Sequence, residues 1–455
     1  MNPILFYSTN LEAEHVPFRD ALLKGIAPDR GLYMPTEIPT FSKEEIRSFS
    51  DMDYYEIAFA VSRPFLRDQI PDDDLMNIVK DAYNYPVPLE NAYERKFVMR
   101  LDQGPTASFK DFAARMMGRL MQYYLKQENR NLLILTATSG DTGSAIANAF
   151  YGLDNIKVVV LFPEKEVTAR QRKQMTTLGK NVQIIGLDAK FDDCQALVKT
   201  AFADSELDYL NLSSANSINI GRLLPQAIYY VYAFAKLRAG TDGDDVIFSV
   251  PSGNFGDMMG GLIAYRMGLP VKQFVIVTNE NDEFPTFLKT GTYDIISPSL
   301  NCISSAMNVG HPSNISRVVA LYGGAMDEKG NIGKMPDLDE MRKDMVSYSV
   351  TDKETEETIQ KAYEKFELLL EPHGAVGWAG LIRYLKDHPE MDTPEQCFVS
   401  LETAHPAKFP EKIIELLSFD PPLPPSLADI EAKEESYDTL SNEYEDFKRY
   451  LKERY

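Results

Sequence analysis

A lysine in an unusual local sequence is the first residue of this chain that could do covalent chemistry. Lys110 lies within residues 104–111 (GPTASFKD), directly before a helix predicted over residues 112–124. A lysine can act as a Schiff-base partner only where it is held in place and partly desolvated. An exposed lysine at a helix start is the ordinary alternative, but Ser-Phe-Lys-Asp after Gly-Pro-Thr is far more specific than a lone lysine. Lys110 is therefore the candidate nucleophile.

Two glycine-containing turns could bind anions. Residues 138–144 (TSGDTGS) and 251–257 (PSGNFGD) each follow a predicted strand and lead into a predicted helix. Glycine lets the backbone approach an anion, and the N–H groups of the following helix point at it. A plain strand-to-helix turn is the alternative for each. The second turn is too short for a Walker A loop and lacks its lysine, but its Gly-x-x-Gly spacing still suits a phosphate.

Two more segments carry polar side chains at an element boundary. Residues 215–222 (ANSINIGR) precede a helix predicted over 223–234, and Asn, Ser and Arg side chains grouped at a helix start favour an anion site. Arg222 could equally be a surface residue whose aliphatic stem packs on the protein. His405, within residues 401–409 (LETAHPAKF), could be a general base, although a histidine before proline in a turn is more often structural.

Short apolar segments alternate with helical stretches from about residue 96 onward. We predict strands over 132–135, 157–162, 182–185, 246–250, 274–277 and 397–400, and helices over 144–150, 168–178 and 192–203. Continuous β-branched runs between helices are typical of parallel strands buried on both faces, and so of an α/β fold. Open sheets of this kind bind ligands beyond the carboxyl ends of their strands, which is where the glycine-rich turns fall.

The two ends of the chain differ from this pattern. The first eighty or so residues read as a mostly helical cap, in which Ser42 and Glu45 have the spacing of a capping box. Near the other end, residues 421–425 (PPLPP) form a stiff connector. After it, apolar residues at helical spacing predict an amphipathic helix that docks on the body of the protein: Leu440, Tyr444, Phe447 and Leu451.

Composition narrows the function classes. The 455 residues suggest two or three domains, and the formal net charge of −21 disfavours nucleic acid and anionic membranes as partners. An anion site in so acidic a chain must supply its own positive field. Three isolated cysteines (Cys194, Cys302 and Cys397) argue against disulfides and zinc, and fit a reducing compartment. With no signal peptide or long apolar run visible, we expect a cytoplasmic monomer or homodimer without a metal ion.

Taken together and in this order, the motifs resemble the threonine synthase family, in the longer form found in many bacteria and in fungi. The matching segments are residues 31–35 (GLYMP), 108–111 (SFKD), 139–143 (SGDTG), 216–219 (NSIN), 252–257 (SGNFGD), 371–376 (EPHGAV) and 403–406 (TAHP). The resemblance covers about residues 5–415. It implies an α/β protein with the tryptophan-synthase-β-like fold (pyridoxal-phosphate fold type II), in which two α/β domains hold the cofactor between them. The expected parts are an N-terminal cap (1–95), a large cofactor domain (96–110 and 230–420), a small α/β domain (111–229) and a C-terminal helical tail (421–455).

The resemblance also implies roles for single residues. Lys110 would be the Schiff-base lysine and catalytic group for pyridoxal 5'-phosphate (PLP). The other expected cofactor-binding residues are Gly253, Asn254, Phe255, Gly256 and Asp257 around its phosphate, Thr403 near its pyridine nitrogen, and Asp141. The expected substrate-binding residues are Thr138, Ser139, Gly140, Thr142, Asn216, Ser217 and Arg222. Related enzymes carry Asn where Asp141 stands, beside the phenolic oxygen of the cofactor, so the charge of Asp141 is left open.

The implied reaction is that of a carbon–oxygen lyase, which converts O-phospho-L-homoserine and water to L-threonine and phosphate by γ-elimination and then β-addition of water. Two glycine-rich turns plus Arg222 suit two phosphates, one of the cofactor and one of the substrate. A lyase or dehydratase for an unphosphorylated or differently phosphorylated hydroxy amino acid is the alternative, and it would not need Arg222. A binding protein that kept the fold without the activity would be expected to lose Lys110 or a phosphate loop, and both are present.

Overall fold

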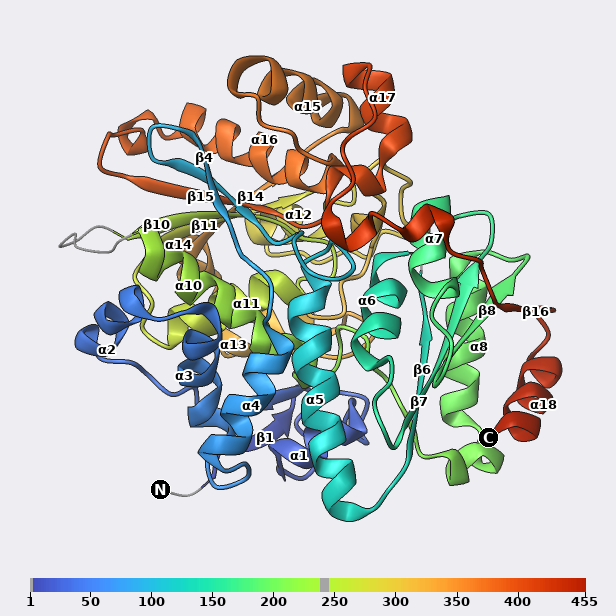
Figure 1. Cartoon of the computed structure of the whole chain (residues 1–455). Coiled ribbons are helices and arrows are strands. Elements are labelled where there is room, and N and C mark those ends of the chain that lie inside the picture. The colour runs from blue at the N-terminus through green and yellow to red at the C-terminus, as the bar shows by residue number, and fades with distance from the viewer. Residues whose placement is uncertain (1–2, 139, 238–244) are drawn as a thin grey trace.

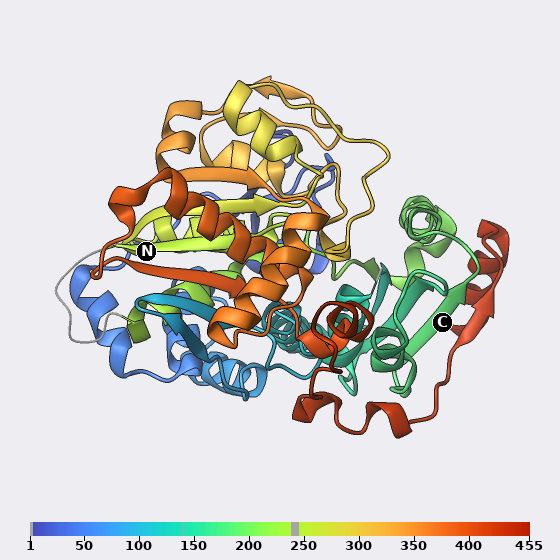
Figure 2. The same cartoon turned by 90° about the horizontal axis from the view of Figure 1, so that it is seen from above.

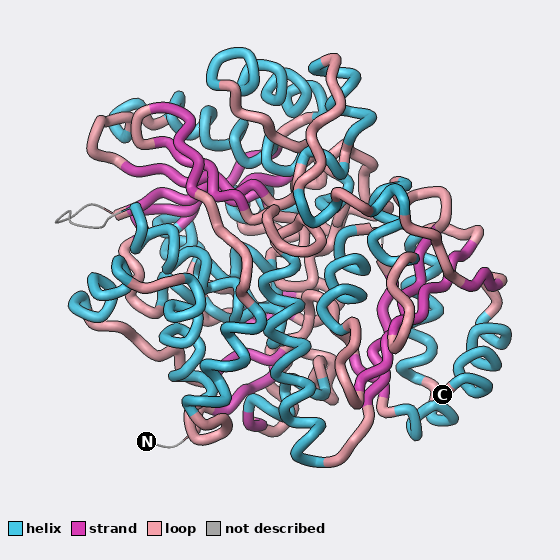
Figure 3. The backbone as a smooth tube through the Cα atoms, viewed as in Figure 1, coloured by secondary structure: helices cyan, strands magenta, loops and turns pink. Residues whose placement is uncertain are grey.

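The computed structural model describes residues 3–138, 140–237 and 245–455. Two β-sheets lie side by side in it, each covered by helices on both faces (Figures 1 and 2). A tube drawing shows most of the strands gathered into these two groups, with a few short strands apart from them (Figure 3). The predicted α/β architecture is therefore confirmed.

The turn of residues 251–257, which is the second candidate phosphate site, lies at the carboxyl end of a strand in the larger sheet. Its strands are parallel to their neighbours except for the antiparallel edge strand β4, in the order β14 (Met345–Ser349), β11 (Val271–Thr278), β10 (Val246–Pro251), β15 (Cys397–Glu402), β5 (Lys96–Arg100) and β4 (Leu89–Tyr93). One face is covered by α15 (Asp352–Phe366), α16 (Pro372–Asp387) and α17 (Pro410–Leu417). Near the other face lie α10 (Ala227–Leu237), α11 (Gly256–Arg266) and α13 (Ile315–Leu321). Every residue of β10 and β15 is buried, as the apolar runs predict.

The smaller sheet is parallel throughout, in the order β16 (Asp438–Leu440), β8 (Val182–Leu187), β7 (Ile156–Pro163), β6 (Leu132–Ala137) and β9 (Leu212–Ser213). Helices α5 (Lys110–Glu128), α6 (Asp141–Phe150) and α7 (Ala169–Thr176) pack on one side of it. Helices α8 (Phe191–Ala203) and α18 (Tyr444–Arg454) pack on the other.

Two predicted helices differ from the structure. Leu440 lies in strand β16, where it pairs with Leu187 at the edge of the smaller sheet, and the C-terminal helix begins only at Tyr444. The helix predicted over 223–234 is divided into α9 (Ile220–Leu223), a 3₁₀ turn (Leu224–Gln226) and α10. Pro225 lies at this division, because a proline has no N–H to donate within a continuing helix.

The N-terminal residues form a small antiparallel sheet and several helices. The sheet has the order β2 (Val16–Pro17), β1 (Leu5–Ser8) and β3 (Tyr33–Pro35), and the helices are α1 (Phe18–Lys24), α2 (Lys43–Ser48), α3 (Tyr54–Leu66) and α4 (Asp72–Ala82). The predicted capping box is present: the Ser42 hydroxyl accepts from the Glu45 N–H at 3.2 Å, and the Glu45 carboxylate accepts from the Ser42 N–H at 2.7 Å. Helices α3 and α4 pack on α10 and α5, so this cap supports helices that carry the site.

The remaining elements are α12 (Glu283–Thr290), α14 (Leu338–Asp344) and the β-hairpin of β12 (Ala325–Met326) and β13 (Ile332–Lys334). Within the described ranges, no helix combines the length and the apolar composition that crossing a membrane requires.

Candidate functional site

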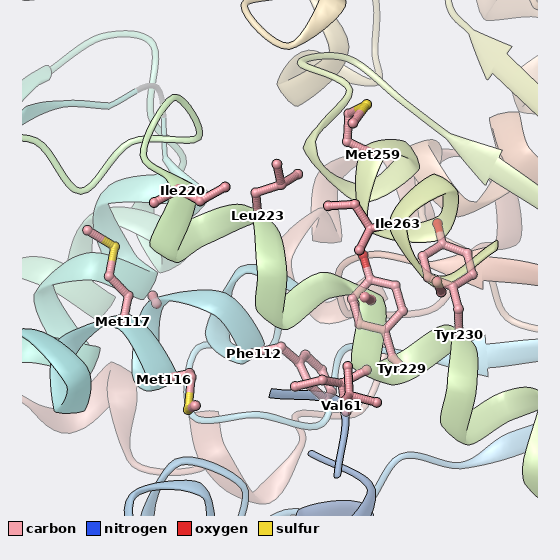
Figure 4. Close-up of a cluster of buried hydrophobic side chains, with 14 of the residues drawn as sticks. Val61, Phe112, Met116, Met117, Ile220, Leu223, Tyr229, Tyr230, Met259 and Ile263 are labelled. Atoms are coloured by element: carbon pink, nitrogen blue, oxygen red, sulfur yellow. The ribbon is translucent and has the colours of Figure 1, made fainter. Parts of the chain in front are cut away.

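A buried cluster of large side chains holds together the helices that carry the candidate residues (Figure 4). Phe112 of α5 packs edge-on against Tyr229 of α10, with ring centroids 5.9 Å apart. Leu223 of α9 and Ile263 of α11 are fully buried in the same cluster. Because interiors are close-packed, the packing in this cluster fixes α5, α9 and α11 relative to one another. Those segments carry Lys110, the 251–257 loop and Arg222.

Lys110 lies at the start of α5 in a buried group of charges. Its Nζ is 3.9 Å from Oδ2 of Asp141. Burial lowers the pKa of Lys110 below its ordinary value, and the positive charges of Lys408 and Arg222 lower it further, against the opposing effects of Asp141 and Asp257. A larger fraction of the amine is therefore unprotonated than for an exposed lysine, which is what a nucleophilic amine requires.

The loop before Lys110 is fixed by hydrogen bonds at both ends. The Asp111 carboxylate accepts from the Thr106 N–H at 2.8 Å and from the Thr106 hydroxyl at 2.6 Å. The Phe109 N–H donates to the carbonyl oxygen of Thr403 at 2.8 Å, so the loop is joined to the end of β15. Lys110 and Thr403, which are far apart in the sequence, are thereby brought to the same place.

Asp141 begins helix α6 and is held by an unexpected partner, Lys408. Its Oδ1 accepts from Lys408 Nζ at 2.7 Å and from the side-chain amide of Gln171 at 2.9 Å. Burial alone would raise the pKa of Asp141, but the ammonium groups of Lys408 and Lys110 hold it below its ordinary value. The neighbouring ammonium groups therefore favour the ionised form of Asp141.

The 251–257 loop joins β10 to α11. Phe255 adopts a left-handed backbone conformation (φ 61°) directly before the helix, and its ring is fully buried. A Cβ on Gly253 would lie 2.8 Å from Cα of Met307, so only glycine fits there. The loop closes on itself because the Asp257 carboxylate accepts from the Ser252 hydroxyl at 2.5 Å, while the Asn254 side chain accepts from the Ser313 N–H at 2.9 Å. Burial raises the pKa of Asp257 to about 6. Helix α11 is long enough for its first N–H groups to favour an anion at the start of the helix.

The segment that contains Asn216, Ser217 and Arg222 adjoins this loop. A Cβ on Gly256 would lie 4.0 Å from Cβ of Ser217. The Asn216 amide oxygen accepts from the Thr136 hydroxyl at 2.6 Å.

Arg222 is 4% exposed, and one of its Nη atoms donates to the carbonyl oxygen of Ala215 at 2.7 Å. Its Nε has no hydrogen-bond partner among the described residues. Burial lowers the pKa of Arg222 to about 10, which still leaves it cationic at neutral pH. A buried guanidinium with an unpaired N–H is an incomplete anion site, since buried polar groups are as a rule hydrogen-bonded.

The 138–144 turn is partly closed by its own side chain. The Thr138 hydroxyl accepts from the N–H groups of Gly140 at 3.0 Å and Gly143 at 2.8 Å. Gly140 has a φ of 139°, and Thr142 lies half-buried in the first turn of α6. Ser139 lies outside the described residues. Of this turn, Asp141 lies next to Lys110 and Lys408, whereas the Thr138 hydroxyl accepts hydrogen bonds from the turn's own backbone.

Thr403 and His405 follow strand β15. Thr403 is buried, and its hydroxyl donates to Oε1 of Glu371 at 3.4 Å. His405 accepts from the Ala407 N–H at 3.1 Å through its Nδ1, and burial lowers its pKa to about 4. The neutral His405 caps a short turn, in agreement with the structural interpretation of a histidine before proline.

Three features of the site were not assigned from the sequence. They are Lys408, the buried pair Glu371 and His373, and Arg317, which is fully buried and donates to the carbonyl oxygens of Tyr33 and Ile218. Lys408 lies within the same segment as His405, but no spacing in that segment distinguishes a buried lysine from an exposed one.

The residues fit PLP on three structural grounds. A lysine whose side chain is only 14% exposed and whose pKa is lowered is available for the aldehyde. A glycine-containing loop, in which a side chain at Gly253 would collide with backbone, leads into helix α11 beside it. The unpaired Nε of Arg222 leaves a cationic donor for a further anion.

Known protein families match this chain over successive ranges of its sequence, and one of them is pyridoxal-phosphate dependent. The family model described as "Threonine synthase N terminus" matches residues 5–83, "Pyridoxal-phosphate dependent enzyme" matches 86–399, and "Threonine synthase, C-terminal" matches 374–451. The chain is 38% identical to the threonine synthase of Haemophilus influenzae over 446 residues, which are 98% of this chain and 99% of the relative. It is 38% identical to that of Escherichia coli, with 93% of each chain covered.

Solved structures give the same result. The PLP-bound threonine synthase from Brucella melitensis matches with a TM-score of 0.91 and 37% identity, over 99% of both chains. Yeast threonine synthase matches with a TM-score of 0.90 and 30% identity, over 99% of this chain and 98% of that one. These matches confirm the expected tryptophan-synthase-β-like fold and the dependence on PLP. The chain belongs to the threonine synthase family of pyridoxal-phosphate-dependent enzymes.

Proposed function

We propose that this chain converts O-phospho-L-homoserine and water to L-threonine and phosphate, with PLP bound through Lys110. The observation that supports it best is the buried Arg222, whose unpaired Nε lies in the same charge group as Lys110 and next to the segment that adjoins the 251–257 loop. An unphosphorylated amino acid would leave that donor without a partner. Two anion sites beside one reactive lysine suit a phosphorylated cofactor and a phosphorylated substrate.

Each residue has a proposed task. When bound, PLP supplies an electron sink for the carbanions of the reaction. Lys110 holds the cofactor and then moves protons at the Cα and Cβ atoms of the substrate, which its lowered pKa favours. Gly253, Asn254, Phe255, Gly256 and Asp257 bind the cofactor phosphate, and Thr403 and Asp141 contact its ring. The substrate is bound by Arg222, Asn216 and Ser217 and by the turn that contains Thr138, Ser139, Gly140 and Thr142.

Further proposals concern the whole molecule. We propose that the chain divides into a cap (1–95), a large domain (96–110 and 230–420), a small domain (111–229) and a tail (421–455). Strand β16 of the tail pairs with the smaller sheet. We also propose a cytoplasmic monomer or homodimer that binds no nucleic acid and no metal ion.

The proposal is tested by product analysis. With O-phospho-L-homoserine and PLP, the protein is expected to release phosphate and threonine in equal amounts, and with homoserine it is expected to form neither. Formation of 2-oxobutanoate and ammonia from threonine, with O-phospho-L-homoserine left unchanged, would instead favour the dehydratase alternative.

Gly256→Val is expected to weaken PLP binding. A Cβ at this position lies 3.1 Å from the Gln226 amide and 4.0 Å from Ser217 Cβ, so a branched side chain fills the space beside the loop where backbone must approach the phosphate. We expect at least about a tenfold rise in the dissociation constant, of the size that losing one charge-assisted hydrogen bond gives. Equilibrium dialysis against PLP measures it.

Gly333→Val is the matched control, because a Cβ there meets nothing within 4 Å. If both variants retain PLP equally well, the cofactor phosphate binds elsewhere, and the 138–144 turn becomes the next candidate.

A further inference from the structure

A buried ion pair joins the two halves of the site. Lys408 ends a 3₁₀ turn (Pro406–Lys408) that follows β15 of the larger sheet, whereas Asp141 begins α6 on the smaller sheet. The Lys408 side chain has no exposed area, and its Nζ donates to Asp141 Oδ1 at 2.7 Å and to the carbonyl oxygen of Thr106 at 2.8 Å. A lysine is almost never fully buried unless it is paired, so this position is specified by its partners.

These contacts orient the Asp141 carboxylate. Its Oδ1 is occupied by Lys408 and by the Gln171 amide at 2.9 Å, and its Oδ2 faces Lys110 Nζ at 3.9 Å. A hydrogen bond between nitrogen and oxygen spans about 2.7–3.2 Å, so Asp141 attracts Lys110 without binding it. The Lys110 amine is left without a hydrogen bond to its nearest carboxylate.

The charges around Lys110 indicate how the loss of Lys408 would change the protonation of the Lys110 amine. Asp141 and Asp257 favour its protonated form, and Lys408 and Arg222 oppose them, in a setting where burial already disfavours a charge. If Lys408 were removed, Asp141 would lose its strongest partner and turn its full charge on Lys110. A nearby unpaired carboxylate stabilises an ammonium group, and the amine would then be protonated over a wider pH range.

We propose that Lys408 is a positioning residue of the reaction: it binds Asp141 across the two sheets and so keeps the Lys110 amine available to the cofactor aldehyde and to substrate protons. The inference rests on the proposed function, because it assigns Lys408 a task toward Lys110 as the cofactor lysine. Lys408 itself contacts no reacting atom in this account and acts through Asp141.

The test follows covalent attachment of PLP to the cofactor-free full chain as a function of pH, by visible absorbance. Lys408→Met is expected to move the midpoint of the pH–rate profile upward by about one unit or more, the size of shift that a nearby charge produces. Attachment near pH 7 then slows about tenfold, since the reactive fraction of an amine falls tenfold per unit below its pKa. Lys408→Arg keeps the charge and is expected to restore most of the rate.

Two further variants separate charge from packing. Lys412→Met is the matched control: Lys412 pairs with Glu356 and Glu415 on α15 and α17, and its loss is expected to leave the midpoint unchanged. Lys408→Met combined with Asp141→Asn removes both charges and is expected to bring the midpoint back toward that of the unmodified protein. If Lys408→Met alone does not fold, comparison of Asp141→Asn with the double variant isolates the Lys408 charge, and the single variant is expected to have the lower midpoint.

Equal midpoints in Lys408→Met and the unmodified protein would overturn the inference. In the absence of a folded Lys408→Met protein, equal midpoints in Asp141→Asn and the double variant would do the same. Both results would leave the proposed function standing as long as the unmodified protein attaches PLP at Lys110. Failure of that attachment would overturn the proposed function, and the inference with it.

Discussion

Lys110→Ala is expected to abolish turnover of O-phospho-L-homoserine and to remove the visible absorbance of bound PLP. Alanine has no amine to attach to the aldehyde and none to move the substrate protons. Lys110 makes no hydrogen bond to Asp141, which retains its contacts with Lys408 and Gln171 in the variant. The fold should therefore persist. Steady-state phosphate release and an absorbance spectrum measure the two effects.

Lys126→Ala is the control for this variant, because Lys126 lies near the other end of the same helix and its side chain is 53% exposed. It is expected to keep both activity and absorbance. A Lys110→Ala protein that turned over at a near-normal rate would show that another amine, such as that of Lys408, does the chemistry.

Arg222→Ala is expected to lower kcat/KM for O-phospho-L-homoserine by about ten- to a hundredfold. A charge-assisted hydrogen bond to a phosphate contributes about 1.5–3 kcal/mol. The loss is larger if the contact shortens as the phosphate leaves, because only interactions that strengthen in the transition state raise the rate. Arg222→Lys should recover part of the activity, since an ammonium group cannot form the bidentate contact of a guanidinium.

Two controls separate substrate binding from structure. An unphosphorylated amino acid should still change the PLP absorbance in Arg222→Ala with nearly unaltered affinity. Arg130→Ala, at a side chain that is 49% exposed, should leave kcat/KM unchanged. If phosphorylated and unphosphorylated ligands weaken equally in Arg222→Ala, then Arg222 supports the backbone at Ala215 rather than the substrate.

The positive field of the site is built inside an acidic chain. The formal net charge is −21, yet Lys408, Arg222 and Arg317 are buried around the site, and the Lys110 side chain is only 14% exposed. Arg317 donates to Asn314 and to the carbonyl oxygens of Tyr33 and Ile218, and burial lowers its pKa to about 9 without making it neutral at pH 7. Because carbonyl and amide oxygens solvate Arg222 and Arg317, their charges remain available to anions. Surface acidity therefore does not set the charge around the site.

The local sequence pattern predicted much of the fold correctly. Apolar β-branched runs such as residues 157–162, apart from the exposed Lys157, and 246–250 became buried parallel strands, since burial on both faces demands that composition. Leu440 did not follow its helical spacing because β8 offers a free sheet edge to residues 438–440, which no local pattern reveals. The division at Pro225 is predictable from the missing N–H of proline, which outweighs the helical pattern of the apolar run around it.

The site shows the same limit. Lys110, the 251–257 loop and Arg222 each lie in a local motif, so their sequence context could predict them as site residues. The partnership of Asp141 with Lys408 depends on how the two sheets meet, and nothing near either residue records it. The side chain of Thr138 illustrates the converse, because a hydroxyl in a glycine-rich turn is as able to bind its own backbone as a ligand.

In the proposed reaction, phosphate leaves by cleavage of the carbon–oxygen bond at Cγ, and water adds at Cβ. The most direct test is turnover of O-phospho-L-homoserine in ¹⁸O-enriched water, with both products analysed by mass spectrometry. The proposed reaction gives threonine with one solvent oxygen in its hydroxyl group and phosphate with no oxygen from the solvent. Solvent oxygen in the phosphate, with homoserine as the organic product, would mean cleavage of the phosphorus–oxygen bond and would contradict it.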